Sequence, residues 1–219
     1  MSTTLITGAN RGIGLELCRQ LAAAGATVIA ACRERSTALE ATGAEIVDGV
    51  EVTDEASLQR LASALEGRRI DVLINGAGIL SRETLDDLDL GRIRRQFEVN
   101  ALGPLRVTHA LADNLGDGSK VFIITSRMGS VEDNTSGGMY GYRMSKAAVN
   151  MVGRSLAQDL KPRGISVHLL HPGMVATEMT GGKGIPVSES AANLIERMGE
   201  LGQGHSGTFY HAAGDPLPW

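Results

Sequence analysis

A glycine-rich turn near the N-terminus constrains the fold of the 219-residue chain more than any other feature. It has the sequence GANRGIG (residues 8–14) and follows TTLIT, a short run typical of a buried strand. Residues 15–24 then have the apolar spacing of an amphipathic helix, which Gly25 would end. Glycines in such a turn let the backbone approach a pyrophosphate, and the helix N-terminus offers unpaired N–H groups and a positive dipole end. A tight βα turn alone would also use glycine, but three glycines between a strand and a helix favour dinucleotide binding.

Beyond this turn, hydrophobic runs alternate with helical patterns. The further runs that indicate strands are residues 27–32, 45–52, 70–75, 120–126, 165–171 and 207–210. Helical patterns lie between most of them, at residues 56–65, 90–115 and 144–160. Strands that are hydrophobic along their whole length and alternate with helices indicate a parallel sheet covered on both faces. We therefore predict an α/β fold, a Rossmann-like doubly wound parallel sheet of about seven strands, in one domain over residues 1–219.

Tyr142 and Lys146 lie four residues apart in the sequence YRMSK. On a helix, residues i and i+4 share one face, so the phenol and the ammonium would stand side by side. A cation beside a phenol lowers the phenol pKa, which is about 10 when unperturbed, and favours proton exchange nearer neutral pH. Such a pair also occurs on ordinary solvated helix faces. Tyr140 competes for the same role, but its own i+4 neighbour is the uncharged Met144.

Several motifs in this order resemble the short-chain dehydrogenase/reductase family, over residues 3–219. They are TGxxxGxG at residues 7–14, NGAG at 75–78, Asn100, Ser126, YxxxK at 142–146, and Pro172–Gly173. More narrowly, the sequence is similar to the small carbonyl-reductase and C-signal (C-factor) branch. The segments that carry this similarity are SRMGS at 126–130, NTSGG at 134–138, YRMSK at 142–146 and LPW at 217–219.

The resemblance implies hydride transfer between a nicotinamide and a carbonyl or carbinol carbon. Tyr142 would be the acid in reduction and the base in oxidation, and Lys146 would lower the Tyr142 pKa and bind the nicotinamide ribose. Ser126 would hold the carbonyl oxygen within reach of the phenol. Asn100 would help to hold a water relay between Lys146 and solvent.

The charge after the second strand predicts which dinucleotide binds. An acidic residue there would bind the ribose 2′-OH of NAD, whereas arginine suits the 2′-phosphate of NADP. The chain has Arg33 at this place and Arg11 in the glycine turn, which favours NADP(H) and leaves NAD(H) as the alternative. Two residues depart from the family pattern: Gly76, which would loosen its turn, and Glu51, which stands where an adenine-binding aspartate is usual.

The full set of expected cofactor contacts combines these residues with those implied by the resemblance. It comprises Gly8, Asn10, Arg11, Gly12, Ile13, Gly14, Arg33, Glu51, Val52, Asn75, Gly76, Ala77, Gly78, Tyr142, Lys146, Pro172, Gly173, Val175 and Thr177. A short substrate loop is expected around residues 175–187, with a flexible GGKG segment, an open pocket and loose substrate selectivity. Four methionines in segments that should border the pocket would form an adaptable apolar wall; they are Met128, Met139, Met174 and Met179.

Composition excludes several other classes of protein. The net charge of −4 gives no sign of a nucleic-acid or anionic-membrane partner, and no apolar run approaches the roughly 20 residues that span a bilayer. The five histidines lack metal-ligand spacing, so no metal is expected, and Cys18 and Cys32 suit buried hydrophobic positions better than a disulfide. The first strand follows Met1 too closely for a signal peptide, which predicts a cytoplasmic protein. A homo-oligomer is compatible with the sequence.

Two functions remain open. The favoured one is an NADPH-dependent carbonyl reductase that acts on an aldehyde, a ketone or a quinone, with a small carbonyl or alcohol molecule as its substrate. The alternative is a dinucleotide-binding signalling or regulatory protein of the C-signal type with little turnover. The complete set of Ser126, Tyr142 and Lys146 favours the enzyme, because a pure binding module needs no acid.

Overall fold

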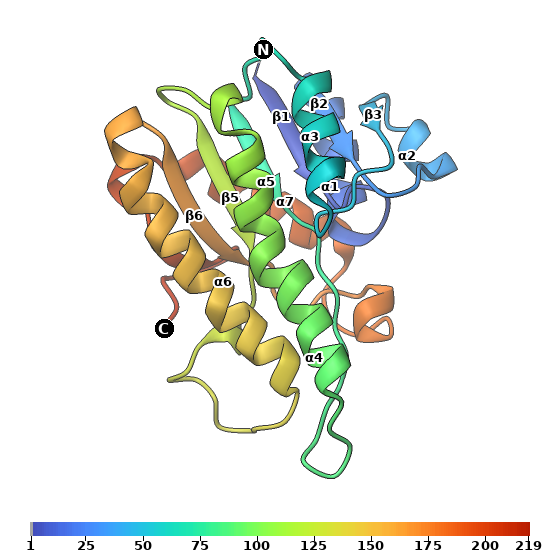
Figure 1. Ribbon diagram of the computed structural model, residues 1–219, viewed down its shortest axis with the longest axis vertical. Coiled ribbons are helices and arrows are strands. Elements are labelled where there is room, and N and C mark those ends of the chain that lie inside the picture. The colour runs from blue at the N-terminus through green and yellow to red at the C-terminus, as the bar shows by residue number, and fades with distance from the viewer. Residues whose placement is uncertain (1) are drawn as a thin grey trace.

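The computed structural model describes residues 2–219 and contains a seven-stranded, fully parallel sheet (Figure 1). Its strands are β1 (Thr3–Thr7), β2 (Thr27–Ala31), β3 (Glu45–Val47), β4 (Val72–Asn75), β5 (Lys120–Ile124), β6 (Ser166–His171) and β7 (Phe209–His211). Their order is β3-β2-β1-β4-β5-β6-β7, so the winding direction reverses between β1 and β4. The predicted α/β fold with a doubly wound parallel sheet is confirmed.

Helices cover both faces of the sheet. On one face α1 (Gly12–Ala23) packs beside α7 (Val187–Glu200), while α3 (Glu55–Ala64), α5 (Gly103–Ala110) and α6 (Tyr140–Asp159) cover the other (Figure 1). The short α2 (Thr37–Glu40) follows β2, and α4 (Leu90–Phe97) packs against α6. Single 3₁₀ turns occupy Ala112–Asn114, Arg127–Gly129, Lys161–Arg163, Glu178–Thr180 and Gln203–His205. No helix within residues 2–219 is both long and apolar enough to cross a membrane.

Neighbouring residues of the central strands point into two different apolar cores. Leu5 and Ile29 are fully buried in the core beneath α3, α5 and α6. Ile6 and Ala30, the next residue in each strand, are fully buried in the core beneath α1 and α7. Because both faces are buried, the strands must be hydrophobic along their length, which is the pattern that the sequence shows.

The helix predicted over residues 90–115 is interrupted. A π-helical turn, Glu98–Leu102, separates α4 from α5. Pro104 lies in the first turn of α5, and its ring nitrogen has no hydrogen to donate to the carbonyl of Asn100 four residues earlier. Regular α-helical bonding cannot continue past this point, and Asn100 sits inside the widened turn.

The third strand and two helices also differ from the sequence prediction, since neither α2 nor α7 was expected. The strand expected over residues 45–52 ends at Val47, because Gly49 adopts a left-handed backbone with φ of 70° and turns the chain. Helix α7 was not predicted, although its buried residues Ala191, Leu194 and Met198 have helical spacing.

The buried imidazole of His168 makes the fold sensitive to acid. The ring stacks on Phe122 with centroids 5.1 Å apart, and its Nε2 lies 3.0 Å from Ser166 Oγ. Burial, followed by the charge of Lys120, lowers the pKa of His168 from its ordinary 6.5 to about 4. Between these two values the unfolded chain binds the extra proton, so the free energy of unfolding must fall as the pH drops from 6.5 toward 4.

We expect His168→Leu to flatten this dependence. The decrease in the free energy of unfolding on acidification should shrink by up to about 3 kcal/mol, since each pKa unit corresponds to about 1.4 kcal/mol. Urea unfolding between pH 7 and pH 4.5 measures it, with the exposed His109→Asn as the control. Equal pH slopes in the His168 and His109 variants would contradict the assignment.

Candidate active site

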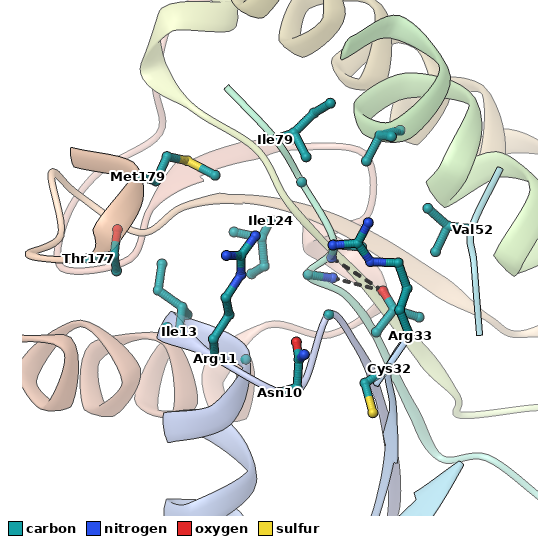
Figure 2. A pocket seen from close by; sticks show the side chains of 18 of the residues that line it. Asn10, Arg11, Ile13, Cys32, Arg33, Val52, Ile79, Ile124, Thr177 and Met179 are labelled. Carbon is teal, nitrogen blue, oxygen red and sulfur yellow. Dashed lines mark hydrogen bonds between the residues drawn. The ribbon is translucent and has the colours of Figure 1, made fainter. Parts of the chain in front are cut away.

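A cavity of about 620 Å³ opens at the carboxyl edge of the sheet (Figure 2). It is bordered by the turn between β1 and α1, the ends of β2, β4 and β5, and the segment 176–179 beyond β6. Most of the expected cofactor residues line it: Gly8, Asn10, Arg11, Gly12, Ile13, Gly14, Arg33, Glu51, Val52, Gly76, Ala77, Gly78 and Thr177. Within residues 2–219 no cluster of histidine, cysteine or acidic side chains has the geometry of a metal site.

Six expected cofactor residues lie outside the lining of this cavity. They are Asn75, Tyr142, Lys146, Pro172, Gly173 and Val175. Asn75 is 2% exposed and donates from Nδ2 to Thr108 Oγ1 at 3.3 Å, so its side chain faces the interior. Val175 pairs with Ile185 in an isolated bridge, and its neighbour Ala176 lines the cavity in its place.

The floor of the cavity depends on glycine at three places. A Cβ on Gly14 would collide with the carbonyl oxygen of Gly8, and one on Gly8 would lie 2.8 Å from Ala77 Cα. Gly76 is equally confined, because its Cβ would lie 2.8 Å from the carbonyl oxygen of Thr7. The turns after β1 and β4 therefore touch backbone to backbone, as a pyrophosphate cradle requires.

The turn at Gly76 is tight, and the expectation that Gly76 loosens it is wrong. Thr7 Oγ1 accepts hydrogen bonds from Gly76 N at 3.2 Å and from Ala77 N at 3.4 Å (dashed in Figure 2). Because a side chain at position 76 would meet the backbone of β1, glycine is the residue that this turn accepts.

Three arginines line the same cavity. Arg33 and Arg95 both approach Glu51 Oε2, at 3.8 Å and 3.9 Å, and Arg11 Nη1 lies 2.8 Å from Glu178 Oε2. These guanidinium groups are more than half exposed, so their ion pairs are weak and can exchange for a bound anion. Arg95 was not among the predicted residues. It reaches the cavity from α4, and nothing in the local sequence marks that helix as part of the cavity wall.

Ser126, Tyr142 and Lys146 come together beside the cavity. Lys146 Nζ lies 5.7 Å from the centre of the Tyr142 ring and donates to the carbonyl oxygen of Ile124 at 2.9 Å. Ile124 lines the cavity, as does Gly78, whose Cβ would lie 3.9 Å from Lys146 Nζ. Ser126 follows β5 two residues later and is 7% exposed. The three side chains thus lie close to one another, next to the part of the cavity lining formed by Ile124 and Gly78.

Burial controls the ionisation of these groups. It raises the pKa of the Tyr142 phenol, with the Ser126 hydroxyl acting in the opposite direction. It also lowers the pKa of Lys146 to about 8. On balance the pKa of Tyr142 is therefore raised, opposite to the expected direction, because loss of water around the phenol outweighs the other influences. A phenol with a raised pKa stays protonated at neutral pH.

Asn100 joins the loop after β4 to α6. Its side-chain oxygen accepts from Ile79 N at 2.8 Å, and its Nδ2 donates to Ile79 O at 2.9 Å and to Ser145 Oγ at 3.0 Å. Asn100 is 1% exposed, so the side chain is engaged entirely by protein groups. The amide fixes the cavity wall at Ile79 relative to the helix that carries Lys146. The water relay expected around Asn100 stays a prediction.

Backbone hydrogen bonds and a 3₁₀ turn shape the segment 175–187. Ile185 N donates to Met174 O at 2.8 Å, and Ala176 N donates to Ile185 O at 2.9 Å, which closes the segment at its base. A 3₁₀ turn, Glu178–Thr180, lies between these bonds and places Met179 on the cavity wall (Figure 2). Of the four methionines expected at the pocket, Met179 is the one that lines this cavity.

Comparison with known proteins agrees with this geometry. The model of a family described as short chain dehydrogenase matches residues 2–185. The 1-hydroxy-2-glutathionyl-2-methyl-3-butene dehydrogenase of Rhodococcus sp. (strain AD45) is 46% identical, with 100% of both chains covered. The C-signal of Myxococcus xanthus is also 46% identical, over 68% of this chain and 93% of that protein. The NADPH-bound carbonyl reductase from chicken fatty liver superposes with a TM-score of 0.90 at 30% identity, covering 100% of this chain and 99% of that one.

The contact between the Ser126 turn and α6 can be tested at Gly129. A Cβ on this residue would lie 2.7 Å from the backbone carbon of Lys146, so Gly129→Ala must push the turn away from the helix. We expect a loss of about 1–3 kcal/mol in the free energy of unfolding, as for other overpacked contacts. Urea denaturation measures it.

Gly199→Ala is the matched control for this substitution. Gly199 lies in α7 with open space around its Cβ position, and alanine there should be neutral or should stabilise by up to about 1 kcal/mol. A Gly129 variant as stable as the Gly199 variant would show that the turn is not closely packed.

Proposed function

The chain belongs to the short-chain dehydrogenase family of oxidoreductases, and we propose that within it the protein is an NADPH-dependent reductase of carbonyl compounds. The observation that carries the proposal is the convergence of Ser126, Tyr142 and Lys146 beside a cavity whose lining contains confined glycines and three arginines. The substrate would be a small aldehyde, ketone or quinone, or the corresponding alcohol in the reverse direction.

The raised pKa of Tyr142 supports a role as the acid in reduction. A phenol that stays protonated at neutral pH can donate its proton to the oxygen of a carbonyl group as negative charge develops there. Ser126, directly beyond β5, would donate a hydrogen bond to the same oxygen and hold it beside the phenol. A bound nicotinamide supplies the hydride.

Lys146 would act through charge and position. Its ammonium is held by the Ile124 carbonyl, next to the cavity lining, where a ribose hydroxyl of the cofactor would be within its reach. With a pKa of about 8 the group is mostly protonated at neutral pH, so it stabilises the phenolate that forms when Tyr142 gives up its proton.

The arginines that line the cavity support NADP(H) over NAD(H). Arg33 and Arg95 meet at Glu51, so a 2′-phosphate could replace the carboxylate and bind two guanidinium groups. The structural neighbour from chicken fatty liver is an NADPH-bound carbonyl reductase, which supports the same cofactor here.

The likeness to C-signal keeps a second candidate function, a dinucleotide-binding signalling protein with little turnover. The buried, protonated Tyr142 favours the enzyme, because a binding protein has no use for an acid held next to the cofactor site. Two substitutions separate these functions and test the cofactor preference.

Tyr142→Phe should abolish turnover and leave cofactor binding intact. We expect NADPH oxidation with a panel of aldehydes, ketones and quinones to fall at least about 100-fold, since general acid catalysis contributes on this scale. The dissociation constant of NADPH, followed by fluorescence, should stay within about twofold, because the Tyr142 side chain does not line the dinucleotide cavity. Tyr140→Phe is the control and should keep the activity of the wild type. If the wild type and Tyr142→Phe bind NADPH and are equally inert, the signalling function is favoured instead.

Arg33→Ala should weaken NADPH binding by about tenfold or more while it changes NADH binding by less than about threefold, because only NADPH carries the 2′-phosphate. Titrations of both dinucleotides measure the ratio. Arg60→Ala is the control, since Arg60 is an exposed arginine outside the cavity lining. If Arg33→Ala weakened the binding of NADPH and NADH equally, recognition of the 2′-phosphate by this residue would be ruled out.

A further inference from the structure

Glu83 is a buried acidic residue that the proposed mechanism does not use. It lies in the connection between β4 and α4 and is only 1% exposed. Within residues 2–219 no lysine, arginine or histidine nitrogen lies within 4.0 Å of its carboxyl group. A buried carboxyl group is costly unless its oxygens are satisfied, so its contacts identify what it holds.

Neutral donors from three parts of the chain satisfy the Glu83 carboxyl group. Ser81 Oγ donates to Oε1 at 2.5 Å, and Gln96 Nε2 of α4 lies 3.2 Å from Oε1 and 3.3 Å from Oε2. Gly141 N, in the first turn of α6, donates to Oε2 at 3.2 Å. The carboxyl group thus joins the β4–α4 connection, α4 and the start of α6.

Gln96 is held in the orientation that this network needs. Its Oε1 accepts from Ser81 N at 3.0 Å, so the amide hydrogens must face Glu83. Helices α4 and α6 also meet closely here, because a Cβ on Gly141 would collide with the Gln96 amide and lie 3.1 Å from Ile93 Cα. The start of α6 therefore has little freedom to move relative to α4.

The backbone at the start of α6 is strained, and Glu83 holds it on both sides. Met139 has φ of 51°, the one non-glycine residue in the left-handed region within residues 2–219, and its side chain caps no helix N–H. Met139 N donates to the Glu83 carbonyl oxygen at 2.8 Å. Such strain persists only where the surroundings enforce it. Glu83 thus accepts a hydrogen bond from Met139 N through its backbone oxygen and one from Gly141 N through its carboxyl group.

Tyr142 directly follows Gly141, the residue whose backbone N–H binds the Glu83 carboxyl group. We propose that Glu83 is a positioning residue, which caps the N-terminus of α6 from outside the helix and so fixes the Tyr142 phenol relative to Ser126. The helix N-terminus also favours an acidic cap over a neutral one. This inference rests on the proposed function for its catalytic consequence, while the placement of Tyr142 can be observed without turnover.

Glu83→Gln tests the proposal with nearly unchanged volume. The new amide would turn a donor toward at least one of the donors that now face the carboxyl group, and the start of α6 should shift. We expect kcat with NADPH and a carbonyl substrate to fall about tenfold or more, since small misplacements of reacting groups have large effects. The dissociation constant of NADPH should change less than about twofold, because Glu83 does not line the dinucleotide cavity.

A second readout is independent of activity. The chain has three tyrosines, so a protein labelled with ¹³C at tyrosine Cζ gives three resonances, assignable by single Tyr→Phe variants. In Glu83→Gln the Tyr142 resonance should move and that of Tyr210, on β7, should not. Asp86→Asn is the matched control, an exposed carboxylate three residues further along the same connection, and should leave every readout unchanged.

The outcomes separate the alternatives. A purely structural role for Glu83 would lower the urea midpoint but leave kcat and the Tyr142 resonance at their wild-type values, which overturns the proposal. If the wild type reduces no carbonyl compound, the proposed function fails, and the Tyr142 resonance still decides the role of Glu83. If Glu83→Gln does not fold, Ser81→Ala decides: it removes only the 2.5 Å hydrogen bond, and an unmoved Tyr142 resonance in that variant refutes the proposal.

Discussion

The hydrogen bond from the buried Lys146 ammonium to the Ile124 carbonyl is the interaction on which the rest of the site depends. It joins α6 to the carboxyl end of β5. The helix that carries Tyr142 is thereby held beside the strand that leads to Ser126. Burying an ammonium group is unfavourable, which is why the pKa of Lys146 falls to about 8. The glycine at position 129 makes this approach sterically feasible. The fold thus accepts a desolvated cation beside the cavity lining and the Tyr142 ring.

Local patterns were sufficient to predict the parts of this protein that are built from neighbouring residues. The strand, glycine turn and helix at residues 3–24 and the four-residue spacing of Tyr142 and Lys146 are local, and the structure has both. The hydrophobic runs located all seven strands, although the third proved shorter. The three glycines of residues 8–14 marked this turn in the sequence, whereas the contact that confines Gly8 comes from Ala77, after β4.

Features that arise between distant segments were not visible in the sequence. Arg95 reaches the cavity from α4, far along the chain from the glycine turn, and Glu83 matters only because α4 and α6 meet beside it. The direction of the Tyr142 pKa was also missed, because the four-residue spacing reveals the nearby cation but not the burial of the phenol, which raises its pKa. The π-helical turn at Asn100 had a local sign in Pro104, whose effect on the preceding carbonyl determines where the helix breaks.

The anchoring of the β4–α4 connection also determines where this protein can change in length. Residues 79–83 are tied down by Asn100, Gln96 and the start of α6. The next five residues are exposed, and the hydrogen bonds that Thr84 and Asp87 make are to each other. Insertions at residues 84–88 would therefore leave the dinucleotide cavity and the Tyr142 helix undisturbed. Because this segment projects from the body of the domain near the start of α6 (Figure 1), it offers a natural place for relatives to acquire extra loops without loss of the fold.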